Sequence, residues 1–164
     1  MVVKQGIRSL IMRNHIILTL IMAAVLSACS IAYKAKPTPI GVIEGEWRIT
    51  DKNYCPHICA MDDEQASSYK GRILNYSASA VSNGIDSCSS PTFTIHELTQ
   101  DQFEAAYRFP PTNIGLTGQV VTEISVGCND NPHWPAFGAL ILLKDSKTIL
   151  TLWDGVFFEA DRVK

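Results

Sequence analysis

The chain has 164 residues, which suffices for one domain and is short for two. Its 14 Lys and Arg residues nearly balance 16 Asp and Glu residues, and the formal net charge is −2. This balance lacks the positive charge that nucleic-acid binding rewards, so we exclude that class of protein. No segment stays apolar over the roughly 20 residues of a transmembrane helix.

The first segment of the chain has the pattern of an export signal. An apolar stretch of 11 residues, Ile16 to Leu26, follows three basic residues and precedes two small ones. This order is typical of a secretory signal, which is removed from the mature protein. Met12 is a second candidate start, since a signal that begins there is also complete.

The four residues Leu26-Ser27-Ala28-Cys29 resemble the lipobox of bacterial lipoproteins. The resemblance implies cleavage before Cys29 and acylation of its thiol and new amino group by fatty acids such as palmitate. Two or three acyl chains hold a protein in a lipid bilayer far more firmly than one. Ser30 follows the cysteine, which implies the outer membrane in a cell that has one, with the domain facing the periplasm or the surface. The alternative is an ordinary secretory signal with an unrelated cysteine.

Cleavage before Cys29 would leave 136 residues and divide the chain into three parts. We expect a signal peptide over 1–28, a lipidated tether over 29–40 and a single domain over 41–164. Loss of the signal lowers the Lys plus Arg count to 11 while all 16 acidic residues stay, so the mature formal charge is −5. The tether is proline-containing and extends about 3 Å per residue, which would keep the domain near the bilayer.

The remaining cysteines are even in number, as disulfide bonding outside the cytoplasm requires. They are Cys55, Cys59, Cys88 and Cys128, and they allow three connectivities. We favour Cys88 with Cys128 and Cys55 with Cys59. The longer loop should contribute about 4 kcal/mol in the chain-entropy model.

Two short helices are predicted from capping signals. Asp62 or Asp63 can cap a helix that runs through Tyr69. Thr99 and Gln102 have the spacing of a capping box before a second helix.

Strand patterns dominate the rest of the domain. They cover residues 45–50, 72–80, 92–96, 120–128, 136–143, 148–153 and 156–159. The last three form a meander, because a polar hairpin and the turn Asp154-Gly155 separate them. The sequence therefore predicts a mainly β fold, a small antiparallel barrel or sandwich with one or two short helices.

The layout resembles the calycin-like barrels of small periplasmic lipoproteins and inhibitors. Gly45-Glu46-Trp47 near the domain start, the meander strands and Arg162 near the end carry this resemblance. It implies that Trp47 packs beneath Arg162 and closes one end of the barrel.

The most unusual local cluster is Cys55-Pro56-His57-Ile58-Cys59. Two thiolates and an imidazole could supply three metal ligands, and His133 could complete a tetrahedral site. A redox-active cysteine pair is a second interpretation. We favour a structural disulfide, and accordingly predict neither a metal nor another cofactor.

Catalytic motifs do not emerge from the remaining residues. His96 lies in a strand pattern, where a single histidine is far more often a surface residue than a base. No serine sits in a Gly-x-Ser-x-Gly elbow, and Asp62-Asp63-Glu64 lacks the pattern of a calcium loop. We therefore predict a protein that is not an enzyme.

The loop Asn131-Pro132-His133-Trp134-Pro135 is a candidate contact loop. His133 and Trp134 are its candidate binding residues, because a tryptophan between prolines can serve as a rigid apolar anchor at an interface. The alternative is that Trp134 folds back and plugs one end of the barrel.

Three functions are consistent with this sequence. The first is a non-enzymatic module that binds or inhibits an envelope protein. The second is a carrier of a small apolar ligand inside the barrel. The third is a metal protein or enzyme that uses Cys55, His57 and Cys59.

Overall fold

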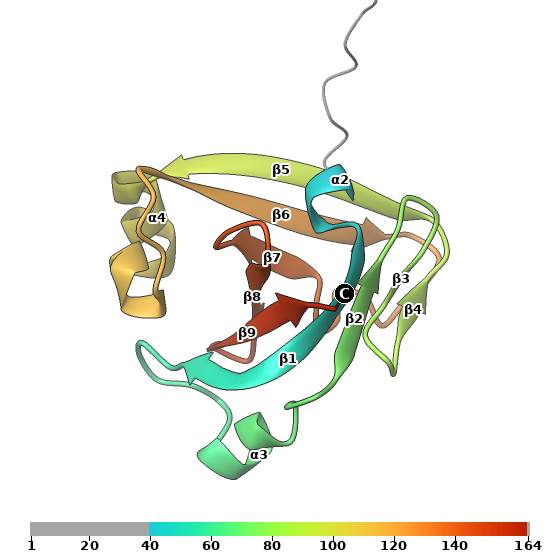
Figure 1. Ribbon diagram of the computed structural model, residues 1–164, viewed down its shortest axis with the longest axis horizontal. Helices are drawn as coiled ribbons and strands as arrows, with labels where there is room; N and C mark the ends of the chain where they lie inside the picture. Colours follow the sequence, from blue (N-terminus) through green and yellow to red (C-terminus); the bar gives the residue numbers. More distant parts are fainter. Residues whose placement is uncertain (1–39, 164) are drawn as a thin grey trace, which may run out of the picture. The chain divides into compact units, whose positions relative to one another are not determined.

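The computed structural model describes residues 40–163, in which nine antiparallel strands curl into a nearly closed barrel (Figure 1). The strand order in the sheet is β4-β3-β2-β1-β9-β8-β7-β6-β5. The strands are β1 (Gly45–Tyr54), β2 (Ile73–Tyr76), β3 (Val81–Ser82), β4 (Ser87–Cys88), β5 (Pro91–Thr99), β6 (Val120–Cys128), β7 (Leu140–Leu143), β8 (Thr148–Trp153) and β9 (Val156–Arg162). The predicted mainly β fold is confirmed.

Within residues 40–163, three short α-helices and one 3-10 helix accompany the strands, one α-helix more than the highest number expected. They are α2 (Ile40–Ile43), α3 (Asp63–Ser67), α4 (Gln100–Tyr107) and the 3-10 helix η1 (Pro111–Ile114). Asp62 caps α3 and Thr99 caps α4, each through a complete capping box, which was predicted for Thr99. Of the two caps expected for the first helix Asp62 is the one used, and that helix ends at Ser67, before the expected Tyr69. The additional helix, α2, begins at the last residue of the expected tether and buries Ile40 and Ile43.

Two predicted strands are shorter than expected. The strand over 72–80 ends at Tyr76, because Ser77 accepts a hydrogen bond from the Ala80 backbone and starts a turn. The strand over 136–143 begins only at Leu140. A turn precedes it, in which Gly138 has a φ of +90° that favours glycine.

The C-terminal meander has the predicted turn. Asp154 and Gly155 have φ values of +48° and +83°, as the mirror-image hairpin turn requires. β9 then pairs with β1, so the first and last strands of the domain are neighbours. One register irregularity lies between Ile49 and Asn53 of β1.

Two hydrophobic cores lie on opposite faces of the sheet. Successive residues of a strand point to opposite faces, and Phe157 belongs to one core while Phe158 belongs to the other. The inner core fills the barrel and includes Trp47, Tyr76 and Phe158. The outer core lies between the sheet and the segment of α4 and η1, which explains why β8 is buried on both faces.

The expected contact between the first and last strands is present. The guanidinium of Arg162 lies over the Trp47 ring, 4.1 Å from its centroid. In the described part of the chain, no helix is long and apolar enough to cross a membrane.

Candidate functional site

The loop over residues 55–59 is closed by a disulfide between Cys55 and Cys59, as predicted. Both sulfur atoms are bonded to each other, so neither is a thiolate that could bind a metal. His57 and His133 are also not brought together. Among residues 40–163, the only cluster of potential metal ligands is Cys88, Cys128 and Asp130.

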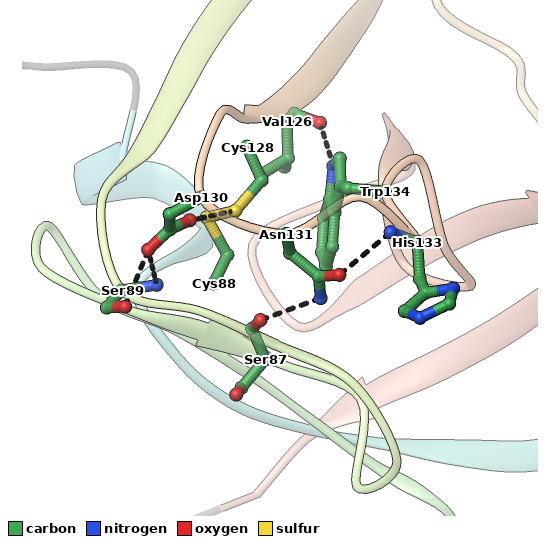
Figure 2. The surroundings of a disulfide bond; sticks show 9 residues. All are labelled: Ser87, Cys88, Ser89, Val126, Cys128, Asp130, Asn131, His133 and Trp134. Atoms are coloured by element: carbon green, nitrogen blue, oxygen red, sulfur yellow. Dashed lines mark hydrogen bonds between the residues drawn. A yellow bond between two sulfur atoms is a disulfide. The ribbon is translucent and has the colours of Figure 1, made fainter.

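That second cluster is no metal site either, because Cys88 and Cys128 form the other predicted disulfide. Asp130 instead accepts hydrogen bonds from the backbone N–H and hydroxyl of Ser89, at 3.3 Å and 2.6 Å (Figure 2). The hydroxyl bond of Ser89 is the main reason that the pKa of Asp130 lies below its ordinary value. The metal hypothesis for Cys55, His57 and Cys59 was therefore wrong.

The disulfide between Cys88 and Cys128 links β4 to the end of β6. These strands are separated along the chain by 40 residues. β4 is one edge of the sheet and β6 lies next to β5, the other edge, so the bond joins opposite ends of the strand order. The disulfide therefore helps to close the barrel and holds the start of the loop over 129–135.

That loop is fixed at several points (Figure 2). Asn131 donates from its side-chain amide to the Ser87 carbonyl, at 3.0 Å, and accepts from the His133 backbone at 2.9 Å. The Trp134 backbone donates to the Asn131 carbonyl at 3.1 Å. The conformation of the loop over 129–135 is thus set by the side-chain amide of Asn131 as well as by the disulfide.

Trp134 points inward in this loop. Its ring is half-buried against the inner core, and its indole nitrogen donates to the carbonyl of Val126. A polar partner for the indole N–H is what a buried tryptophan requires. The arrangement matches the plug interpretation of Trp134 and not the exposed anchor, while His133 remains exposed.

The loop over 55–59 differs, because one of its side chains, that of Ile58, projects into solvent. Ile58 is 97% exposed, the most exposed large hydrophobic residue among those described. Its neighbours are held in place. The Nε2 atom of His57 donates to the Arg108 carbonyl at 3.0 Å, and the ring of His57 meets Phe109 edge to face.

The other end of this loop is held by the β8–β9 hairpin. The backbone N–H of Ala60 donates to the Asp154 carbonyl at 2.9 Å. Gly155 lies so close that a Cβ there would meet the Cα of Cys59 at 3.2 Å. The loop is therefore clamped between two parts of the fold and by its own disulfide, while the side chain of Ile58 stays in solvent.

The loop over 55–59 lies far from the start of the described domain. α2 precedes β1, and the loop follows β1, so the loop and the start of the described domain lie at opposite ends of that strand (Figure 1). Ten residues of strand span roughly 30 Å. Ile58 is thus displayed far from the end at which the chain enters the domain.

A buried ionic cluster on the outer face was not predicted. Glu159 is 4% exposed, and its carboxylate accepts from Lys144 at 2.7 Å, Tyr54 at 3.1 Å and Lys52 at 3.4 Å. Burial opposes ionisation, but Lys144, Tyr54 and Lys52 together hold the pKa of Glu159 below its ordinary value. These residues are scattered along the chain, and no local motif could have revealed the cluster.

The predicted residues have different outcomes. The four cysteines form the two favoured disulfides. His96 is an exposed residue of β5, as expected. Cys29, the signal peptide and nearly all of the tether lie outside the described residues. The sequence marked Ile58 only as part of the cysteine cluster, and its exposure emerges from the structure.

Comparison with protein families, with curated proteins and with solved structures found no match to this chain.

Proposed function

We propose that the protein is a lipid-anchored binding module of the bacterial cell envelope, which engages a partner protein through Ile58 and the loop over 55–59. The observation that carries the proposal is the almost fully exposed Ile58 side chain on a loop clamped on both sides. A single exposed apolar residue is ordinary on a flexible surface. It is informative here because a disulfide and hydrogen bonds to two other parts of the fold hold its loop in place.

The clamp favours binding for a thermodynamic reason. A flexible loop loses conformational entropy when it is ordered in a complex, and a loop that is already fixed loses little. Burial of one isoleucine side chain contributes about 2 kcal/mol. A fixed loop retains most of that gain as affinity.

The shape of the loop indicates the kind of partner. The Ile58 side chain stands out from a five-residue loop closed by a disulfide, and a single protruding apolar side chain fits a concave surface better than a flat one. An enzyme cleft is such a surface. Inhibition of an envelope hydrolase, by insertion of Ile58 into its cleft, is therefore the form of binding that we propose.

The lipobox pattern at Leu26–Cys29 supports the anchoring part of the proposal. A short proline-containing tether would keep the domain near the bilayer, where envelope proteins are met.

The carrier hypothesis receives less support. The inner face of the barrel is occupied by large buried side chains, among them Trp47, Tyr76 and Phe158. These side chains take up the space that an apolar ligand would need.

A photocrosslinking amino acid at position 58 tests the proposal in intact cells. We expect a crosslinked partner that is absent when the same amino acid stands at position 85. Ile85 is a matched control, since it is also an isoleucine in a turn and is 75% exposed. An Ile58→Ser variant should lose the partner in co-purification while Ile85→Ser retains it. Equal capture by both variants would contradict the proposal.

A further inference from the structure

Strand β5 is an open edge of the barrel. It pairs with β6 over nine consecutive residue pairs without a register shift. In the described part of the chain no strand lies on its other side, and Figure 1 shows it as the outermost strand. The opposite margin of the sheet, β4, is only two residues long and cannot cover it.

The direction of the backbone groups on β5 follows from a contact on β6. The backbone N–H of Val126 donates to the Ala139 carbonyl at 2.7 Å, so Val126 directs its backbone groups toward β7. Because backbone direction alternates along a strand, its β5 neighbour Phe93 faces the open edge, and so do Ile95 and Glu97. Among residues 40–163, no backbone hydrogen bond is made by these three residues on that side.

The side chains of Phe93 and Ile95 are left incompletely covered. They lie opposite Val126 and Ile124, which are buried in the inner core, so they share the inner face of the sheet. Phe93 is half-buried, and Ile95 is 38% exposed. An additional strand beside β5 would cover both.

The protective features of this edge lie only at its ends. Edge strands usually avoid pairing through proline, lysine, bulges or charges that point inward. In β5 these are Pro91 at the start and Glu97, which shares the inner face, near the end. Residues 92–96 between them have none, and the centre of this unprotected stretch is Thr94.

We infer that a second copy of this chain adds its β5 to this edge, antiparallel and about a twofold axis at Thr94. Phe93 then lies opposite the partner's Ile95, and Thr94 opposite the partner's Thr94. Aromatic with β-branched pairs and Thr–Thr pairs are favourable across strands. The same surface serves both copies, so the assembly closes as a dimer.

Other registers of the same pairing are less favourable. An axis at Ile95 places the Glu97 carboxylate beside the partner's Phe93. An axis at His96 places two histidines opposite each other. Both registers also bring a protective residue into the paired stretch, whereas the axis at Thr94 leaves Pro91 and Glu97 at its margins.

Cysteine crosslinking of the purified full-length chain tests the register. Thr94→Cys should form a disulfide-linked dimer under mild oxidation, because the two residues face each other at the axis. His96→Cys is the matched control on the same strand face, and it should not crosslink, since it lies opposite the partner's Thr92. The unmodified chain reports any crosslinking through Cys29. A His96→Cys crosslink, or none at Thr94→Cys, overturns the inference.

Sedimentation of the full-length chain over a dilution series tests the pairing itself. Ile95→Pro removes a backbone donor at the open edge and should abolish the dimer, while Ile95→Thr keeps the donor and should retain it. Thr94→Lys, at an exposed position that folding does not require, should also abolish the dimer by opposing like charges. A wild-type monomer at every concentration, or a dimer insensitive to both Ile95→Pro and Thr94→Lys, overturns the inference. The loop over 55–59 is unaltered in all these variants, so the result is independent of the proposed function.

Discussion

Arg162 lies over the indole ring of Trp47, with its guanidinium carbon 4.1 Å from the ring centroid. The two residues are partners in the register of β9 with β1, and the guanidinium also donates to the carbonyls of Glu44, Val42 and Ser146. One side chain thus joins the first strand, the segment before it and the β7–β8 hairpin.

Arg162→Ala should therefore lower the free energy of unfolding by about 2 kcal/mol, through loss of a cation–π contact and charged hydrogen bonds. Urea unfolding followed by tryptophan fluorescence measures this. Arg162→Lys should restore only part of the loss, because an ammonium cannot present a planar fork to three carbonyls. Arg48→Ala, at an exposed position on β1, is the control and should have little effect.

Removal of Lys144 should be more costly than removal of Lys52, although both contact Glu159. Lys144 lies at 2.7 Å with a side chain 25% exposed, and Lys52 at 3.4 Å with a side chain 67% exposed. Loss of the closer partner leaves a buried carboxylate poorly compensated, and we expect Lys144→Met to destabilise the fold by about 3 kcal/mol. Lys52→Met should cost under about 1 kcal/mol. Equal losses in urea unfolding would show that the cluster is not organised around Lys144.

The same cluster should make stability depend on pH. The pKa of Glu159 is lowered in the folded state, so its contribution is present above the ordinary value near 4.5. That contribution is lost as the pH falls through the folded-state pKa, since the unfolded chain then binds more protons. Glu159→Gln should be less stable than wild type at neutral pH and should lose less stability on acidification. A parallel decline of both proteins would contradict this assignment.

The two disulfides should contribute unequally. The bond between Cys88 and Cys128 spans 40 residues, and the bond between Cys55 and Cys59 spans four. In the chain-entropy model the first contributes about 4 kcal/mol and the second about 2 kcal/mol. Replacement of each pair by serine, followed by thermal unfolding, measures both contributions.

Loss of the shorter disulfide should also affect binding. The Cys55→Ser, Cys59→Ser variant should stay folded but release the clamp on Ile58, so partner capture should fall without loss of the barrel signature in circular dichroism. Retention of full capture would show that the disulfide does not preorganise the loop.

Local signals predicted the secondary structure well where a side chain acts within a few residues. Asp62 and Thr99 marked helix starts because helix capping is local. Asp154-Gly155 marked a hairpin because its backbone angles suit few other residues. The prediction of a strand over 72–80 was too long. The Ser77 hydroxyl hydrogen-bonds to the backbone of Ala80, and the resulting turn ends the strand despite the strand pattern.

Features formed by residues far apart along the chain were harder to predict from the sequence. The cysteine pairing was correctly favoured because Cys88 and Cys128 each lie beside a polar turn near a strand pattern, while Cys55 and Cys59 are close along the chain. The Glu159 cluster joins residues that no spacing rule connects, and the outer core arises because α4 and η1 fold back on the sheet. The orientation of Trp134 was left open for the same reason, as its partner is the carbonyl of Val126 eight residues earlier.

Trp134→Ala should therefore act on stability and not on binding. We expect a loss of about 2 kcal/mol, below the cost for a fully buried tryptophan, because the ring is only half-buried. Capture of the partner should be unchanged when both proteins are compared below their unfolding transitions. His133→Ala, at the exposed neighbour, should leave stability unchanged. Loss of capture in Trp134→Ala at full stability would move the binding site to this loop.

The lipid anchor is tested separately from the domain. Cys29→Ser should prevent both acylation and the cleavage that depends on it, since serine offers no thiol. We expect the wild-type protein to partition into the detergent phase and to carry the mass of two or three acyl chains in intact-mass spectrometry. The variant should lack that mass while its domain unfolds at the same urea concentration, because the substitution leaves the sequence of residues 40–163 unchanged. A wild-type protein that partitions into water and begins at another residue would point to an ordinary secretory signal.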